Sequence, residues 1–117
     1  MKAALPPEVG EFLGDFTAQD VVMKNLERAV QVCVDVANHL VSDRKLPPPP
    51  SMGAAFVALV REGIVTPDLG ERLRKTVGLR NLAVHEYEAI DYTLVHGLIQ
   101  TDLVVFEDFA RAILARL

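Results

Sequence analysis

The sequence has few of the features that mark secreted or membrane proteins. It contains one cysteine, Cys33, so it cannot form an intramolecular disulfide, whereas a small secreted domain usually carries several. No apolar run approaches the ~18 residues of a membrane span. The first residues include Pro6 and Pro7, where a signal peptide would need its apolar helix. We therefore expect a soluble, cytoplasmic protein that does not contact membranes, with Cys33 as a small buried hydrophobic residue.

An excess of positive charge is also missing. Twelve Lys and Arg residues against 16 Asp and Glu residues give a net charge of −4, which argues against a protein that covers a nucleic-acid duplex. Any nucleic-acid contact must be local. The sequence contains no glycine-rich phosphate loop, and its three histidines lack partners at metal-ligand spacing. We expect neither a metal ion nor a cofactor.

What is present suits one helical domain. A chain of 117 residues matches the usual domain size of about 100 to 150, so we expect residues 1–117 to form a single domain. Half of the residues are apolar, but no stretch shows a convincing alternation of apolar and polar residues, as a half-buried strand requires. The sequence therefore predicts an all-α fold, specifically an antiparallel up-and-down helical bundle.

Caps and apolar spacing predict where the helices begin and end. The long first helix is expected to be capped by Thr17, to pack Phe16 on Val21 and to reach about Leu40. Only a turn or two is expected before Phe16. The later boundaries are a stiff proline connector at 46–51, a short helix capped by Ser51 and ending near Gly63, a helix from Thr66-Pro67 into the mid-eighties, and a last helix from Asp91 nearly to Leu117.

The stretch 71–87 carries the most chemistry. Arg72, Arg74, Lys75 and Arg80 against Glu71 make a patch of local positive charge that could bind an RNA backbone. The alternative is a solvated helix face with an ion pair between Glu71 and Lys75.

Two turns within this stretch bring together Arg80, Asn81, His85 and Tyr87. A histidine can take a proton from a ribose 2′-hydroxyl or give one to the leaving 5′-oxygen, and an arginine can stabilise charge on phosphorus. On a straight helix, however, Arg80 and His85 lie about 140° apart. Either the arginine side chain bends round the helix, the helix ends near His85, or a second copy of the chain completes the site.

The segment Arg80-Asn-Leu-Ala-Val-His85-Glu-Tyr87 is an Arg-x4-His-x-Tyr motif. With the upstream segment 35–40 (Asp-Val-Ala-Asn-His-Leu) and Asp91 downstream, it resembles the HepT-like branch of the HEPN superfamily, from about residue 16 to 117. The resemblance implies a dimeric helical toxin that cleaves RNA without metal and is inhibited by a minimal nucleotidyltransferase antitoxin, which transfers AMP to it. It assigns catalysis to Arg80 and His85 and AMP acceptance to Tyr87, and it gives Asn81 a positioning role.

Other polar residues receive smaller roles. Asp35 lies in the resembling segment and could support the site, against the alternative of an exposed or hydrogen-bonded residue. We expect local hydrogen bonding from His39 and a structural role for His96. Relatives generally begin with a longer helix than the residues before Phe16 permit.

Two other functions remain open. The chain could be a non-catalytic subunit that presents nucleotide or another substrate to a nucleotidyltransferase, with Arg80 binding phosphate. It could also be a structural dimer in which the Arg-His-Tyr segment is only an interface network. The ribonuclease-toxin hypothesis, in contrast, predicts RNA cleavage by a homodimer, with a 2′,3′-cyclic phosphate product.

Overall fold

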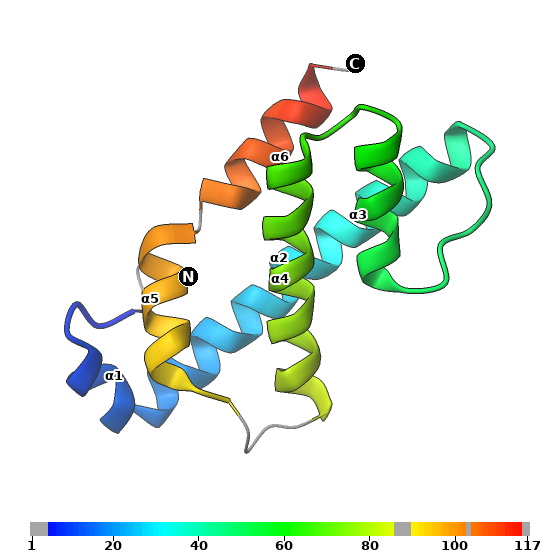
Figure 1. Ribbon diagram of the computed structural model, residues 1–117. Coiled ribbons are helices and arrows are strands. Elements are labelled where there is room, and N and C mark those ends of the chain that lie inside the picture. Colours follow the sequence, from blue (N-terminus) through cyan, green and yellow to red (C-terminus); the bar gives the residue numbers. More distant parts are fainter. Residues whose placement is uncertain (1–4, 86–89, 103, 116–117) are drawn as a thin grey trace.

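The computed structural model describes residues 5–85, 90–102 and 104–115, and its regular elements in these ranges are all helices (Figure 1). The helices are α1 (Val9–Gly14), α2 (Phe16–Asp43), α3 (Met52–Arg61), α4 (Pro67–His85), α5 (Tyr92–Asp102) and α6 (Val104–Leu114). The expected all-α class is therefore confirmed. None of the helices in the described ranges is both long and apolar enough to cross a bilayer.

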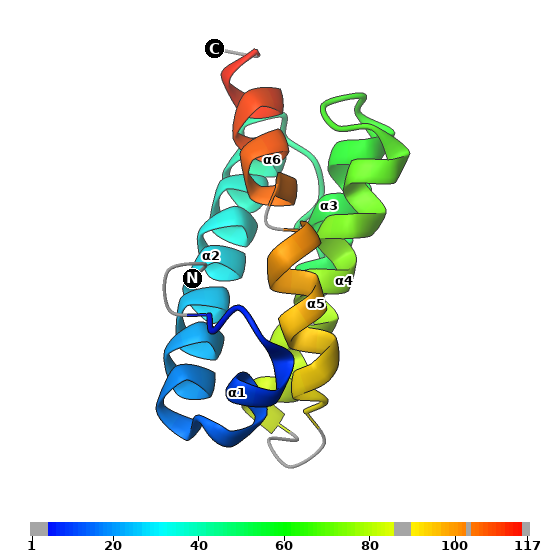
Figure 2. The ribbon, with the colours of Figure 1, turned by 90° about the vertical axis from the view of Figure 1, so that its left-hand side faces the viewer.

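Helix α2 is the central element, and it contacts α1, α3, α4 and α6. It runs for 28 residues because apolar side chains recur along it every three or four positions. The short helix α1 packs on α2 and α5 at one end of the molecule (Figure 2). The apolar residues of α2 that are fully or almost fully buried are Val22, Leu26, Val30, Val34, Ala37 and Val41.

The start of α2 differs from our prediction. Asp15, not Thr17, caps the helix, and its carboxylate accepts a hydrogen bond from the Ala18 N–H at 3.0 Å. The cap must have an extended backbone, and the chain is extended at Asp15 because α1 has just ended there. Phe16 is 74% exposed, so it does not form a buried staple with Val21.

The last helix was predicted as one element, and this prediction was wrong because the structure has two helices, α5 and α6. Ile99 of α5 and Val105 of α6 are both buried. On one straight helix these residues, six positions apart, would lie about 120° apart around the axis. Dividing the segment into two helices allows both apolar faces to reach the core.

Helices α3 and α4 begin as predicted. Ser51 Oγ accepts the N–H of Ala54, and Thr66 Oγ1 accepts the N–H of Leu69, both at 3.2 Å. The chain leaves α3 through Gly63, whose φ of 72° favours glycine. The two helices lie side by side (Figure 1). This packing places α4, which carries most of the predicted site, against the core through Leu69, Leu73 and Val77.

Candidate functional site

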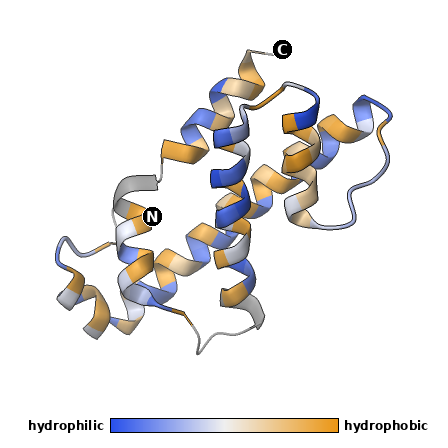
Figure 3. Cartoon of the chain, in the orientation of Figure 1, coloured by the Kyte–Doolittle hydropathy of each residue, from blue (hydrophilic) through white to orange (hydrophobic). Residues whose placement is uncertain are grey.

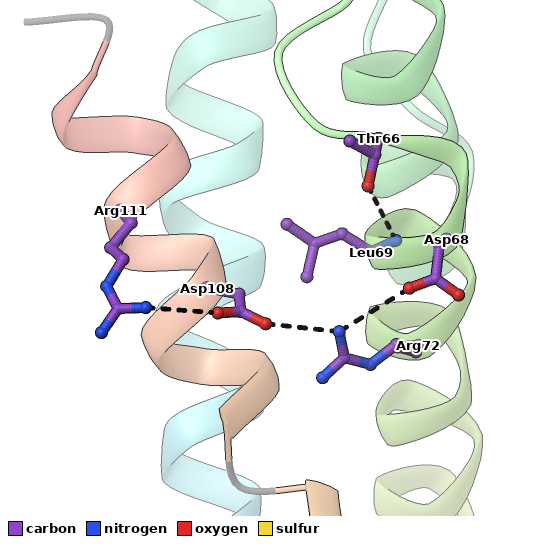
Figure 4. Close-up of polar contacts among 6 residues, drawn as sticks. All are labelled: Thr66, Asp68, Leu69, Arg72, Asp108 and Arg111. Atoms are coloured by element: carbon purple, nitrogen blue, oxygen red, sulfur yellow. Dashed lines mark hydrogen bonds and ion pairs between the residues drawn. The ribbon is translucent and has the colours of Figure 1, made fainter.

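The first half of α4 is tied to α6 by ion pairs (Figure 4). Arg72 Nη1 lies 3.3 Å from Asp108 Oδ2 and 3.8 Å from Asp68 Oδ2, while Arg111 Nη1 approaches the other oxygen of Asp108 at 3.7 Å. Only 27% of the Arg72 side chain is exposed. Its charge is thus already paired within the fold, although its predicted contact with RNA stays a prediction.

The next two cations of the predicted patch face solvent. Arg74 donates from Nε and Nη2 to the two carboxylate oxygens of Glu71, at 3.0 and 2.9 Å. These hydrogen bonds lower the pKa of Glu71 and raise that of Arg74. Glu71 therefore hydrogen-bonds to Arg74 rather than to Lys75. Lys75 is exposed and has no ion pair with another described residue.

The guanidinium of Arg80 contacts the side chain of the next residue. Its Nη1 donates to Asn81 Oδ1 at 3.3 Å, and its buried Nε has no hydrogen-bond partner among the residues that the structure describes. The described part of α4 reaches His85.

The other half of the predicted pair is not visible. The side chain of His85 and the whole of Tyr87 lie outside the described part of the chain. A direct approach of the Arg80 guanidinium to the His85 imidazole therefore stays a prediction, as does the role of Tyr87.

Two grooves flank the exposed face of α4. One, of about 460 Å³, lies between α4 and the start of α3 and is lined in part by Ser51, Gly53 and Asn81. The other, of about 570 Å³, lies between α4 and α5. Arg74 and Gly78 line both. We did not single out Gly78 from the sequence, although a glycine inside a helix-forming segment is a signal that asks for a packing or functional reason.

The structure keeps Asp35 and His39 on the surface of α2. Asp35 is exposed and accepts a hydrogen bond from Gln31 Nε2 at 2.9 Å, and it lines neither groove beside α4. Its supporting role stays a prediction. His39 Nε2 lies 3.3 Å from Asp43 Oδ2, which confirms the expected local contact.

Two further residues have structural roles, as expected. His96 is buried, and its Nε2 lies 2.8 Å from the carbonyl oxygen of Pro6, so it holds the N-terminal segment against α5. Cys33 is buried in the core, and this burial raises the pKa of its thiol to about 11. No three His, Cys, Asp or Glu side chains gather as a metal site within the described ranges.

Comparison with known proteins assigns the chain to a family. Residues 4–113 match the family model described as ribonuclease HepT-like. The mRNA nuclease HepT of Shewanella oneidensis is 39% identical over 105 residues, which cover 90% of this chain and 79% of the relative. The tRNA nuclease HepT of Aphanizomenon flos-aquae is 30% identical over 103 residues, covering 88% of this chain and 70% of the relative.

Solved structures agree with this assignment. The tri-AMPylated Shewanella oneidensis HEPN toxin in complex with its MNT antitoxin superposes with a TM-score of 0.86 at 39% identity, covering 90% of this chain and 79% of that one. A crystal structure of the toxin–antitoxin with AMP-PNP gives a TM-score of 0.85 at 38% identity, covering 88% and 79%. The helical fold, the Arg-x4-His-x-Tyr motif and these matches show that the chain belongs to the HepT-like ribonuclease family.

Proposed function

We propose that this chain is the toxin of a toxin–antitoxin pair and cleaves RNA with Arg80 and His85. The observation that carries the proposal is the hydrogen bond from Arg80 to Asn81, on the helix that also carries His85. Positions 81 and 85 are four residues apart and therefore share a helix face. Asn81 thus draws the guanidinium towards the face on which position 85 lies. The two relatives named as nucleases support RNA as the substrate.

The chemistry follows from these two groups. Neutral His85 takes the proton of a ribose 2′-hydroxyl, and the resulting oxygen attacks the adjacent phosphorus. The P–O5′ bond breaks, the 5′-oxygen receives a proton from an imidazolium, and the other product carries a 2′,3′-cyclic phosphate. Arg80 stabilises the charge that develops on the phosphorus oxygens, and Asn81 positions Arg80. No metal takes part in these steps.

A homodimer would complete this site. One imidazole cannot accept and donate a proton in the same step, so a second His85 near the same phosphate would supply the acid. A two-fold axis beside the end of α4 places both copies of Arg80 and His85 at one cleft. Asp35 would support the site there, and Arg74, Lys75 and Arg72 would bind flanking phosphates.

The decisive experiment is RNA cleavage by His85→Ala and Arg80→Ala, with His39→Ala as the matched control. We expect both site variants to lose cleavage and growth inhibition, while the control keeps them because His39 is exposed and contacts only Asp43. Circular dichroism should show folded protein in all three cases. Mass spectrometry of the product should find the cyclic phosphate, and EDTA should leave the rate unchanged. Cleavage by His85→Ala at the wild-type rate would refute the mechanism.

The alternative function makes an opposite prediction. A non-catalytic subunit would bind nucleotide through Arg80 and would show no turnover of RNA. Wild-type protein that binds nucleotide, with affinity lost in Arg80→Ala, but cleaves no RNA would establish this function instead.

We also propose that a minimal nucleotidyltransferase inactivates the chain by transferring AMP to Tyr87. The tri-AMPylated state of the Shewanella relative supports this proposal. Tyr87 is two residues beyond His85, so a bulky, negatively charged group there would exclude RNA. The measurement is intact mass after incubation with the transferase and ATP. We expect adenylyl additions that disappear in Tyr87→Phe but persist in Tyr92→Phe; additions that survive Tyr87→Phe would place the acceptor elsewhere.

A further inference from the structure

Gly78 has no packing reason to be a glycine. A Cβ at Gly70, on the same helix, would overlap the side chain of Val60, so close contact between α3 and α4 explains that glycine. A Cβ at Gly78 would meet no atom of the described residues within 4 Å. Glycine inside a helix is destabilising relative to alanine, so the position loses stability without any gain in internal packing. A ligand can approach the backbone closely at a position that has no side chain and no neighbouring atoms above it.

The two grooves beside α4 meet at this residue. Both are lined by Arg74 and Gly78. Positions 74, 78, 81 and 85 fall within an arc of about 60° around the helix axis. Gly78 therefore lies where the two grooves share lining residues, and we call the two grooves together the trough.

The charge of this trough suits a polyanion. The chain carries 16 acidic residues, yet no acidic residue is among the described residues that line either groove. Lys75 supplies a positive charge that no described carboxylate pairs, Arg74 supplies a guanidinium whose charge Glu71 offsets, and Ser51 and Asn81 supply hydrogen-bonding groups. Figure 3 shows several hydrophilic residues along α4, with hydrophobic ones between them.

The two sides of the trough differ in character. The groove towards α5 is lined by Leu79, Leu82, Leu94 and Leu98, and Leu94 is 57% exposed. These side chains offer an apolar surface to the face of an unstacked base. The bases of a duplex remain stacked and cannot enter such a groove, whereas those of a single strand can turn outward.

We propose that single-stranded RNA crosses α4 at Gly78, with its ribose-phosphate backbone against the helix and a base in the groove beside α5. Arg74 and Lys75 contact the phosphates before the crossing, and the strand continues past Asn81 to Arg80. This inference rests on the proposed ribonuclease function and adds the path of the strand across α4 and a residue that admits it.

The test compares Gly78→Gln with Gly97→Gln. Gly97 is also an exposed helix glycine where a Cβ would meet nothing within 4 Å, but it lines neither groove. The probe is a fluorescent 2′-O-methyl RNA oligonucleotide, which cannot form the cyclic phosphate and so reports binding alone. Anisotropy is measured for the single strand and for its duplex, and cleavage is measured separately on ordinary RNA.

We expect Gly78→Gln to weaken single-strand binding at least about tenfold and to raise KM more than it lowers kcat. Gly97→Gln should change binding less than about twofold, and both variants should melt at or above the wild-type temperature because glutamine favours helix. The duplex should bind more weakly than the single strand. Lys75→Gln should reduce the slope of log affinity against log salt by about 0.7, the loss of one single-strand phosphate contact.

Three results would overturn the inference. Equal binding by Gly78→Gln and Gly97→Gln excludes the crossing, even if the wild type cleaves RNA. Tighter binding of the duplex excludes the single strand. A change of oligomeric state in Gly78→Gln, seen by light scattering, would identify the trough as a contact between copies of the chain. If the wild type binds the probe at Gly78 but cleaves no RNA, the ribonuclease proposal fails while the binding path stands.

Discussion

The two halves of α4 have similar residues in different surroundings. In the first half, Gly70 lies against Val60, and Arg72 is paired with Asp108. In the second half, Gly78 opens to solvent, and Arg80 has a buried Nε with no partner among the described residues. A glycine and an arginine therefore serve internal packing at one end of the helix and remain available for a ligand at the other. Residue type alone does not distinguish these roles.

The largest expected effect concerns Arg80, which forms no ion pair with a described residue. Arg80→Lys should lower kcat/KM for single-stranded RNA by at least about 100-fold, because lysine keeps the charge but loses the planar fork of donors. Arg111→Lys on α6 is the control, since its side chain is 76% exposed and lies away from the proposed site. Steady-state cleavage of a labelled RNA measures both. Full activity of Arg80→Lys would show that charge alone is required at position 80.

The second prediction concerns the packed glycine. Gly70→Ala should reduce the free energy of unfolding by about 1 to 3 kcal/mol, because the new methyl group forces α3 and α4 apart. Denaturant unfolding followed by circular dichroism measures this change. The double variant Gly70→Ala, Val60→Ala supplies space and should recover part of the loss; a single Gly70→Ala variant as stable as the wild type would contradict the tight packing.

The same substitution should have the opposite sign at the open glycine. Gly78→Ala should increase the free energy of unfolding by up to about 1 kcal/mol, because alanine is the better helix former and its methyl group meets no neighbour. The same unfolding experiment measures the gain. Destabilisation would indicate that position 78 is covered in the folded protein, for instance by a second copy.

The smallest effect concerns the ion pair between α4 and α6. Asp108→Asn should cost about 0.5 kcal/mol of folding free energy, because the pair is partly exposed and Arg72 retains Asp68 as a partner. Cleavage of RNA should not change. High salt should reduce the difference between variant and wild type, and a loss of activity without a loss of stability would give Asp108 a part in RNA binding.

Local signals predicted most of the fold. The caps Ser51 and Thr66 and the apolar spacing of α2 involve residues within a few positions of one another, so they could be read directly from the chain. The cap of α2 was misplaced because Asp15 and Thr17 are both good capping residues, and only the turn after α1 selects Asp15. The division between α5 and α6 depends on the direction of the core, which the local pattern does not contain.

The candidate site was predictable in its residues and less so in its contacts. The motif identified Arg80, Asn81 and His85, and the hydrogen bond from Arg80 to Asn81 joins adjacent residues. The patch at Arg72, Arg74 and Lys75 was read as one charged surface. In the fold these three residues differ, because Arg72 contacts the carboxylate of Asp108, which lies 36 residues away in sequence.

The sequence by itself determined that the chain forms helices, where most of them begin, and that it carries the motif of its family. These properties depend on neighbours along the chain, through hydrogen bonds between nearby residues and apolar spacing. Only the tertiary structure decided which arginine is paired and which glycine is open. Those properties depend on the atoms that another helix brings close, and at Gly78 on the space that no helix fills.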